Sequence, residues 1–416
     1  MRVVYTLLWW LLLPVMFLYL RWRGRKQPEY RQHWRERLGW APVLPPGPVI
    51  WLHTVSVGET RAAAPLVRAL RAACPEATLL LSHTTPTGRA TGRELFGPDL
   101  VQAYLPYDLP NAIDRFLDRA HPDLCIFLET EIWPNLYARC AARRCPVFLV
   151  NARLSERSAR GYRRVAGLIR PALASLAGLA AQTEADATRL AALGARAPQV
   201  TGNLKFDVTA PPGTETRAAE LRAQFAGRFV FLAASTREGE EKLLLDTCLE
   251  LGVPELLLVI VPRHPQRFDE VASLLESRGV DTVRRSTGAQ VNHDTEVFLG
   301  DSLGELAAYY AAADVAFVGG SLLPLGGQNL IEAADMGCPV LIGPHTWNFL
   351  EAAEQAVAAG AARRVSDPED LARQVKALYR DPALRAAMSA AGRDFSAAHK
   401  GATDKVMAML QPALPR

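Results

Sequence analysis

The feature that most constrains the fold of this chain is an alternation of short apolar runs with longer segments of helical periodicity. The runs carry apolar residues on both faces, which is typical of parallel strands in a sheet covered by helices on both sides. In the first half of the chain they are PVIWLHTVS (48–56), ATLLLSHTT (77–85), VQAYLPYD (101–108), DLCIFLET (123–130), PVFLVNAR (146–153) and GLAAQTE (178–184). The alternation predicts an α/β fold with a doubly wound parallel sheet.

The alternation is interrupted once and then resumes. The interruption, LKFDVTAPPGTETRAAE (204–220), contains two prolines and a glycine in succession and is typical of an interdomain linker. The resumed runs are FVFLAAST (229–236), LLLVIVPRH (256–264), TEVFLGDS (295–302), VAFVGGS (315–321) and PVLIGP (339–344). Since 416 residues are too many for one ordinary core, we predict two Rossmann-like domains facing a cleft, with ligands at the carboxyl ends of the strands. The expected domains are 27–208 and 209–416, with the last helix free to cross back to the first domain.

Residues 1–26 form a separate segment, in which basic residues follow an apolar run. The run from Val3 to Leu20 has no charged residue, and as a helix it would be about 27 Å long, close to the roughly 30 Å of a bilayer's hydrocarbon core. A cleaved signal peptide is the alternative, but it needs basic residues before the run and a small-residue cleavage site after it. Here LRWRGRK follows the run. We therefore predict an uncleaved membrane anchor whose basic flank stays in the cytoplasm and contacts anionic lipids of the inner membrane.

Charge and cysteine content exclude several classes of protein. The formal net charge is +4, and residues 1–37 hold eight basic and two acidic side chains, so the rest of the chain is close to neutral. We expect no nucleic-acid partner, because such a partner needs basic residues spread over the folded body. The six cysteines form no C-x-x-C pair, which predicts reduced, buried thiols and no metal site.

The segment HTVSVGET (53–60) places Glu59 where the first strand meets its helix. A carboxylate there could accept a proton from an attacking hydroxyl group. The alternative is a helix-capping acid that the helix dipole favours. Because the dipole lowers the basicity of a carboxylate, a general base at this position would need partial burial.

Two further segments offer charged groups. Glu129 and Glu131 end the fourth strand in ETEIWPN (129–135), and in an extended segment they would point the same way, toward the cleft. A structural ion pair is the alternative for both. Lys205, in TGNLKFD (201–207) at the domain boundary, could bind an anionic group, and an exposed linker lysine is the alternative.

The second domain contains segments suited to a phosphate. VPRHPQRF (261–268) supplies Arg263, His264 and Arg267 just after a strand. GDSLGEL (300–306) places Gly304 at the start of a helix, where free N–H groups favour anions.

A glycine-rich stretch, GGSLLPLGGQNLIEAADMG (319–337), is the third such segment. Its loop opens a helix on which Asn329 and Glu332, three residues apart, are expected to share one face. The chain has neither a Walker GK[ST] nor a G-x-G-x-x-G fingerprint after a strand, which argues against a kinase, an ATPase or a dehydrogenase. The sequence has no closely spaced cluster of His, Asp and Glu residues, so we predict no essential metal ion.

Taken together, these motifs resemble those of the 3-deoxy-D-manno-octulosonic acid (Kdo) transferases, glycosyltransferase family 30. The matching segments are HTVSVGET, TTPTG, LPYD, ETEIWPN, NARLSERS, TGNLKFD, STREGEE, VPRHPQRF, GDSLGEL and GGQN-x-x-E, in this order over nearly the whole chain. The resemblance implies a GT-B fold and an inverting, metal-independent transfer of Kdo from CMP-Kdo to lipid IVA, the lipid A precursor, in lipopolysaccharide biosynthesis. It implies no cofactor besides the donor substrate and a catalytic body on the cytoplasmic face of the inner membrane. A UDP-sugar transferase of the same fold and a noncatalytic membrane adaptor are the competing interpretations.

The resemblance also implies residue roles. Glu59 matches the general base, and Glu129 and Lys205 match transition-state stabilisers, with Glu131 near enough to take the place of Glu129. The segments that match the CMP-binding segments contain Pro262, Arg263, Leu303, Gly304, Glu305, Asn329, Leu330, Ile331 and Glu332. Leu330, where the pattern has proline, and Leu325 depart from the family pattern.

Overall fold

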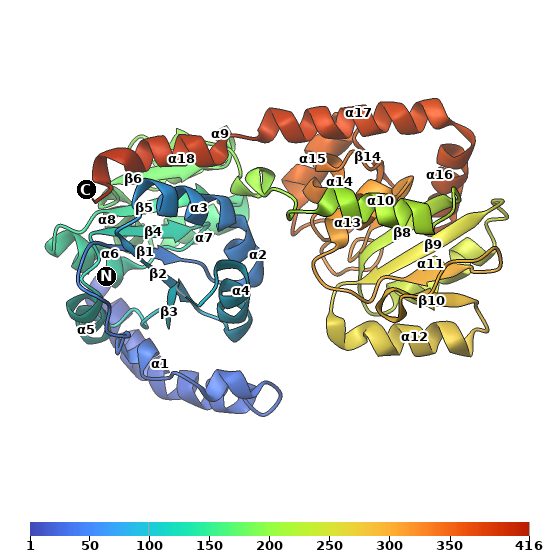
Figure 1. The fold of residues 1–416 in the computed structure, drawn as a ribbon. Helices are drawn as coiled ribbons and strands as arrows, with labels where there is room; N and C mark the ends of the chain where they lie inside the picture. The colour runs from blue at the N-terminus through green and yellow to red at the C-terminus, as the bar shows by residue number, and fades with distance from the viewer. Residues whose placement is uncertain (99, 416) are drawn as a thin grey trace. The chain divides into compact units, whose positions relative to one another are not determined.

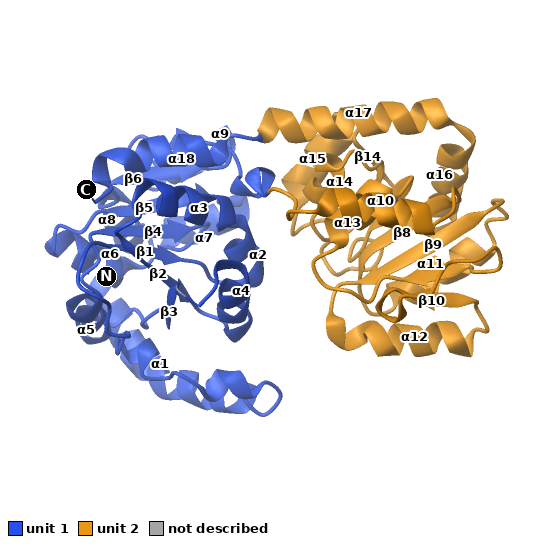
Figure 2. Ribbon diagram, in the orientation of Figure 1, with its two compact units in different colours: residues 1–208, 400–416 blue, residues 209–399 orange. Residues whose placement is uncertain are grey.

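The computed structural model describes residues 1–98 and 100–415. They divide into two compact units, one made of residues 1–208 with the C-terminal segment from Lys400, and one made of residues 209–399 (Figure 2). The segment after His399 therefore belongs to the first unit, and the second unit is shorter than the expected 209–416.

Unit 1 is built on a parallel sheet of seven strands in the order β3-β2-β1-β4-β5-β6-β7 (Figure 1). Strand order reverses where β1 lies beside both β2 and β4, which is the position where open α/β sheets bind ligands. The strands are β1 Val49–His53, β2 Thr78–His83, β3 Val101–Tyr104, β4 Leu124–Leu128, β5 Val147–Ala152, β6 Gly178–Ala181 and β7 Gln199–Val200.

The sheet of unit 1 is apolar on both faces, as the sequence predicts. Trp51 of β1 packs with Phe116 and Phe127 on one face, while its neighbours Ile50 and Leu52 join a second core on the other face. Helices cover both cores, and α4, α5 and α6 begin with proline at the position that needs no N–H donor. The helices of unit 1 are α1 Arg2–Arg23, α2 Val57–Ala62, α3 Ala64–Ala73, α4 Pro86–Phe96, α5 Pro110–Ala120, α6 Pro134–Ala142, α7 Glu156–Arg164, α8 Ala166–Ala174, α9 Glu184–Ala192 and α18 Ala402–Leu410.

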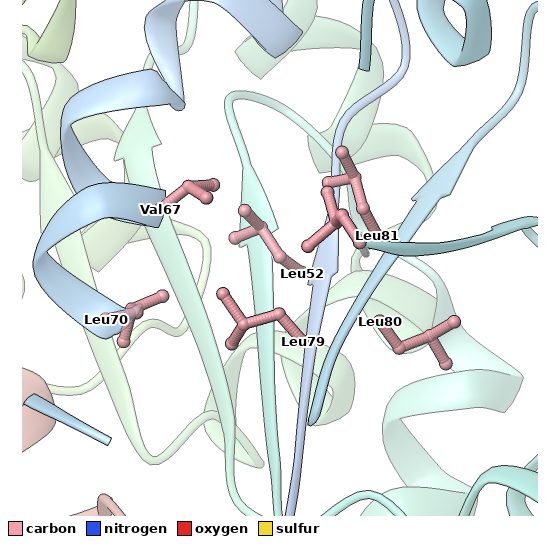
Figure 3. Close-up of a pocket in the computed structure, with 7 residues that line it drawn as sticks. Leu52, Val67, Leu70, Leu79, Leu80 and Leu81 are labelled. Atoms are coloured by element: carbon pink, nitrogen blue, oxygen red, sulfur yellow. The ribbon is translucent and has the colours of Figure 1, made fainter. Parts of the chain in front are cut away.

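The contact between α3 and the sheet leaves a small apolar void. It is lined by Leu52 of β1, by Leu79 and Leu81 of β2, and by Val67 and Leu70 of α3 (Figure 3), with Leu80 and Leu100 completing the lining. No polar side chain lines this space, so it belongs to the packing of the core and offers a polar ligand no recognition.

The last helix, α18, packs on the same core of unit 1 through Val406 and Leu410. Its N-terminus is capped by Asp207, whose carboxylate accepts hydrogen bonds from the N–H groups of Gly401 (2.7 Å) and Thr403 (2.5 Å). Asp207 ends the short 3-10 helix η3 (Leu204–Asp207), which carries Lys205. The C-terminal helix therefore supports the segment that holds a candidate site residue.

Unit 2 repeats the architecture with a parallel sheet in the order β10-β11-β9-β8-β12-β13-β14. Its strands are β8 Phe229–Thr236, β9 Leu256–Pro262, β10 Thr282–Arg284, β11 Val297–Leu299, β12 Val315–Val318, β13 Val340–Ile342 and β14 Ala362–Arg364. Its helices are α10 Thr214–Gln224, α11 Glu240–Leu249, α12 Phe268–Ser277, α13 Leu306–Ala312, α14 Ile331–Asp335, α15 Leu350–Ala358, α16 Pro368–Arg380 and α17 Pro382–His399. Two Rossmann-like sheets are thus present, one in each unit.

The N-terminal apolar run forms helix α1, which is long and apolar enough to cross a membrane by length and composition. Only Leu20 of this helix is fully buried. A partly buried stripe of the helix packs against unit 1.

Candidate functional site

In unit 1 the charged candidates gather beyond the carboxyl ends of β1, β4 and β5. The register pairs His53 of β1 with Phe127 of β4, so the loop that follows β4 begins beside the turn from β1 into α2. Glu59 lies in α2, and Glu129 and Glu131 lie in the β4–α6 loop. The adjacent ends of parallel strands thus bring three carboxylates together.

Glu59 is held by the start of α2. The N–H of Val55 donates to Glu59 Oε2 (2.7 Å) and the Ser56 hydroxyl donates to Glu59 Oε1 (3.2 Å). Ser56 is the N-cap residue and also accepts from the N–H of Glu59, an arrangement close to a capping box. The capping role considered as an alternative for Glu59 is therefore present in the structure.

The same carboxylate has an unusual affinity for protons. Burial, with a smaller contribution from the negative charges of Glu129 and Glu131, raises the pKa of Glu59 to about 8, against the hydrogen bonds from Val55 and Ser56, which lower it. The partial burial that a general base would need at this position is therefore present. A carboxyl group with such a pKa can take up and release a proton near neutral pH.

Glu129 departs from the expected extended conformation. Its φ of 56° places it in the left-handed region, which is uncommon for a residue other than glycine. Its carboxylate binds two cations, Lys205 Nζ at 3.3 Å from Oε1 and Arg153 Nε at 3.2 Å from Oε2. The ion pair considered as an alternative for Glu129 is present, and it joins two predicted site residues, Glu129 and Lys205.

Glu131 contacts a different set of partners from Glu129, and the extended segment expected to point both acids the same way is not formed at Glu129. The indole N–H of Trp133 donates to Glu131 Oε2 (2.9 Å), and His53 Nε2 lies 3.6 Å from the same oxygen. His53 is fully buried, and its Nδ1 is hydrogen-bonded to Ser82 Oγ (2.8 Å). The left-handed conformation of Glu129 breaks the extended alternation on which that expectation rests.

Lys205 belongs to unit 1 and lies in η3, just before the boundary at Val208. Its backbone N–H donates to Asn203 Oδ1 (3.0 Å), and the N–H of the preceding residue, Leu204, donates to Asn151 Oδ1 (3.0 Å). Lys205 is therefore a positioned cation with a carboxylate partner, and it is not an exposed linker lysine.

In unit 2 two of the predicted phosphate-binding segments are in contact. Arg263 directly follows Pro262, the last residue of β9, and its Nε donates to Gln328 Oε1 (3.1 Å) in the glycine-rich loop. The buried carboxylate of Glu240 supports this loop by accepting from the N–H groups of Gly320 (2.6 Å) and Leu322 (3.2 Å). Gly320 has a φ of 68°, a conformation that glycine adopts without strain.

The second part of the glycine-rich segment differs from the expectation. Helix α14 begins at Ile331, so Asn329 precedes it and does not share a helical face with Glu332. Asn329 Oδ1 instead accepts from the N–H of Ile331 (3.1 Å). Leu330 and Ile331 are buried in the core, so their side chains pack internally and only their backbone could meet a ligand.

The segment at Gly304 is exposed. Leu303 has 69% of its surface exposed, and Gly304 has a φ of 77°. Glu305 forms a two-bond ion pair with Arg285, at 3.1 and 2.9 Å, which lowers the pKa of Glu305. In this segment the backbone at Leu303 and Gly304 is exposed to solvent, and the charge of Glu305 is balanced by Arg285.

Arg267 and His264 differ in their surroundings. Arg267 forms ion pairs with Glu241 (2.9 Å) and Glu270 (3.2 Å). Desolvation and the charges of Arg237, Arg263 and Arg267 lower the pKa of the exposed His264. The arginine side chains around His264 leave a positive potential at the end of β9.

The cysteines are all free and buried, as predicted. Their scatter in the sequence conceals a cluster, however, because the sulfur atoms of Cys125, Cys140 and Cys145 lie within 4.8 Å of one another. Hydrogen bonds from Cys125 and Cys140 lower the pKa of Cys145. Cys125 lies near the start of β4, at the opposite end of the strand from the carboxylates.

Sequence reasoning missed three side chains that complete the unit 1 site. Arg153 lies in the NARLSERS segment, His53 in HTVSVGET and Trp133 in ETEIWPN, so each stands within a motif that was singled out. These side chains contact the site carboxylates only because the folded loops bring them together. The spacing of residues along the chain does not predict such contacts.

Comparisons with known proteins bear on the whole chain. A family model described as "3-Deoxy-D-manno-octulosonic-acid transferase (kdotransferase)" matches residues 32–208, and one described as "Glycosyl transferases group 1" matches residues 276–395. The 3-deoxy-D-manno-octulosonic acid transferase of Bordetella pertussis is 45% identical over 99% of this chain and 99% of its own length. The chain belongs to the Kdo transferase family.

Other relatives agree with this membership. The Kdo transferase of Haemophilus influenzae is 37% identical over 100% of this chain and 99% of its own length. A UDP-GlcNAc 2-epimerase from Neisseria meningitidis has a similar fold, with a TM-score of 0.59 and 16% identity over 88% of this chain and 100% of that one. The two parallel seven-stranded sheets are those of a GT-B glycosyltransferase.

Proposed function

We propose that this Kdo transferase moves Kdo from CMP-Kdo to lipid IVA, with inversion and without a metal ion. The observation that carries the proposal is the raised pKa of Glu59, to about 8, beside the ion-paired Glu129 and Lys205. The names of the relatives from Bordetella pertussis and Haemophilus influenzae support Kdo as the sugar. The donor nucleotide and the lipid acceptor rest on the resemblance of the sequence motifs.

In the proposed reaction Glu59 removes the proton from an acceptor hydroxyl group. The oxygen then forms a bond to the anomeric carbon of Kdo while the bond from that carbon to the phosphate oxygen of CMP breaks. The electron pair of the broken bond leaves with CMP, and a single displacement inverts the configuration at the carbon. A base with a pKa near 8 matches this task, because general-base catalysis is most efficient when the pKa lies near the working pH.

Glu129 and Lys205 are the proposed stabilisers of the transition state. Lys205 supplies a fixed positive charge, and fixed charges stabilise developing charge without reorganisation. Glu129 holds the ammonium group at 3.3 Å and shares its own charge with Arg153. Glu131 is linked to His53 and Trp133, which favours Glu129 over Glu131 for this role.

Unit 2 is the proposed site for CMP-Kdo. Arg263 follows β9 and contacts the glycine-rich loop, so it is placed to meet a phosphate by charge and forked geometry. Pro262, the exposed backbone of Leu303 and Gly304, Glu305, and the segment from Asn329 through Leu330 and Ile331 to Glu332 are the other proposed contacts. Leu330 and Ile331 would contribute through their backbone, since their side chains are buried.

The acceptor side of the proposal involves the membrane. Helix α1 is apolar and carries Arg21 and Arg23 in its last turn, with Arg25 and Lys26 just beyond it, a pattern that attracts anionic lipid. We propose that the enzyme is held on the cytoplasmic face of the inner membrane, where its lipid acceptor is embedded and its nucleotide donor is soluble.

A Glu59→Gln variant tests the base. The amide keeps the size of the side chain but cannot accept the proton, so we expect transfer to fall by about 10²–10⁴-fold, with CMP binding largely kept. Glu156→Gln is a matched control at an exposed helix residue. Transfer at the wild-type rate by Glu59→Gln would remove Glu59 from this role.

A nucleotide titration tests the donor. We expect CMP to bind the full-length enzyme in detergent more tightly than UDP, and Arg263→Ala to weaken CMP binding. Tighter binding of UDP would favour the competing interpretation, a UDP-sugar transferase of the same fold.

A further inference from the structure

Helix α1 has two apolar faces with different surroundings. Tyr5, Trp9, Leu13, Phe17 and Leu20 are partly or fully buried, and their spacing of three to four residues places them on one side of the helix. Met16 is also partly buried, and a second set of apolar residues is exposed. They are Val3, Val4, Leu7, Leu8, Trp10, Leu11, Leu12, Val15, Leu18, Tyr19 and Trp22.

The buried stripe packs on unit 1 along most of the helix. Trp9 stacks on Tyr107 with ring centroids 5.6 Å apart, and it contacts Trp133 at 6.5 Å. Two turns later, Phe17 packs against Tyr107 at 6.1 Å and Trp34 at 5.3 Å. Residues 5 to 20 therefore follow the surface of the folded body for about 22 Å.

A polar contact fixes the same helix to the start of α6. The amide group of Asn135 donates one hydrogen bond to Thr6 Oγ1 (2.9 Å) and another to the carbonyl of Asp108 (2.7 Å). The Asp108 carboxylate in turn accepts from the N–H groups of Asn135 (3.0 Å) and Leu136 (2.8 Å). Helix α1 thus contacts the capping network that ends the β4–α6 loop.

This loop contains Glu129 and Glu131, two of the three carboxylates at the candidate site. Trp133 joins the helix to that site, because its ring contacts Trp9 and its N–H binds Glu131 Oε2. The path from α1 to Glu131 therefore consists of two direct contacts.

The exposed stripe fits a lipid surface. Val4, Leu11 and Leu18 lie seven residues apart on it and are each at least 60% exposed, and positions seven apart lie on nearly the same side of a helix. Arg21, Arg23, Arg25 and Lys26 follow and are exposed. An exposed apolar stripe of this kind, with aromatic residues and adjacent cations and with its other face covered by protein, suits contact with an anionic bilayer surface.

We infer that α1 lies in the plane of the membrane surface, with one face in the lipid and the other holding the β4–α6 loop, so that the anchor also positions Glu131. This inference rests on the membrane attachment in the proposed function. An independent membrane-spanning helix would have to leave its contacts with Tyr107, Trp133 and Asn135. In-plane binding keeps them and places the candidate site at the level of the lipid head groups.

Immersion depth tests the orientation without any measurement of activity. Val4, Leu11 and Leu18 are replaced one at a time by spin-labelled cysteine in the full chain, bound to vesicles of phosphatidylethanolamine and phosphatidylglycerol. We expect similar, shallow depths at all three positions, from power saturation with oxygen and a water-soluble nickel chelate. A maximum at position 11 with shallow ends would show a spanning helix and overturn the inference. If all three spin labels were inaccessible to oxygen, a second copy of the chain would cover this face of the helix. That result would also overturn the inference.

The adjacent tryptophans Trp9 and Trp10 test the positioning role. Trp10 is 48% exposed on the lipid side, so Trp10→Ala should weaken vesicle binding about tenfold or more and leave kcat in detergent unchanged. Trp9→Ala should lower kcat in detergent, by about tenfold for a displaced loop, with the KM for CMP-Kdo unchanged.

Trp133→Phe separates positioning from folding, because it keeps the ring against Trp9 and removes only the donor to Glu131. We expect kcat to fall in this variant as well, with an unchanged melting temperature. Wild-type kcat in both Trp9→Ala and Trp133→Phe would overturn the positioning role. If Glu59→Gln nevertheless lost transfer, the proposed function would stand although the positioning role had failed. The two proposals can therefore fail separately.

Discussion

Glu59 combines two tasks in one side chain. Its carboxylate accepts hydrogen bonds from Val55 and Ser56, which favour the ionised form, while burial and the charges of Glu129 and Glu131 favour the protonated form. Burial is the largest of these effects, so the pKa rises to about 8. A carboxylate at a helix start is ordinarily a weak base, and this environment makes it a stronger one.

This pKa predicts the pH dependence of transfer. Only ionised Glu59 can accept the proton, so kcat/KM should rise about tenfold per pH unit well below the pKa and level off above about 8. The measurement is a series of initial rates between pH 5.5 and 9.5, with Glu59→Gln as the control that should lack the rise. A rate that falls between pH 6 and 8 would contradict the assignment.

The sequence predicts which residue types reach this site but not their pairing. Glu59, Glu129 and Lys205 are named from motifs, and the structure brings Glu129 and Lys205 into contact. The φ of 56° at Glu129 has no signature in the sequence, because glutamate rarely adopts the left-handed region. For the same reason the partners of Glu131, and the gathering of Cys125 with Cys140 and Cys145, could not be predicted.

At the scale of elements, apolar runs identify the apolar strands and miss three that contain polar residues. All eleven predicted runs contain a strand, from β1 to β13. Strands β7, β10 and β14 are short and contain polar residues, so they form no apolar run, whereas the three-residue strands β11 and β13 are wholly apolar. Helix α14 is shorter than the periodic stretch that predicts it, because it begins only at Ile331, whose N–H donates to Asn329 Oδ1 ahead of the helix.

The capping of α18 by Asp207 gives a prediction at this scale. Asp207→Ala leaves two N–H groups at the helix start without their acceptor, so it should lower the free energy of unfolding by about 1–2 kcal/mol. Asp404→Ala, an exposed acid in the first turn of the same helix, should change it by less than about 0.5 kcal/mol. Urea denaturation of both variants measures the difference. An equal loss of unfolding free energy in the two variants would contradict a stabilising role of the Asp207 cap.

At the scale of the whole molecule, the proposed reaction joins a soluble donor to a lipid acceptor. Unit 1 carries the three carboxylates and the apolar helix α1, while unit 2 carries Arg263 and the glycine-rich loop. Each unit completes its own sheet and core, so substitutions in one unit are expected to leave the proposed role of the other intact. The overall α/β, two-domain architecture follows from the alternation of the sequence, whereas the sugar follows from the family.

Mass spectrometry of the reaction product tests the central proposal most directly. Purified full-length enzyme is incubated with lipid IVA in detergent and a supply of CMP-Kdo, with Glu59→Gln as the parallel control. We expect lipid IVA to gain the mass of one or more Kdo residues with the wild-type enzyme and to stay essentially unmodified with Glu59→Gln. Unmodified lipid IVA with wild-type enzyme, or equal product from both proteins, would contradict the proposal.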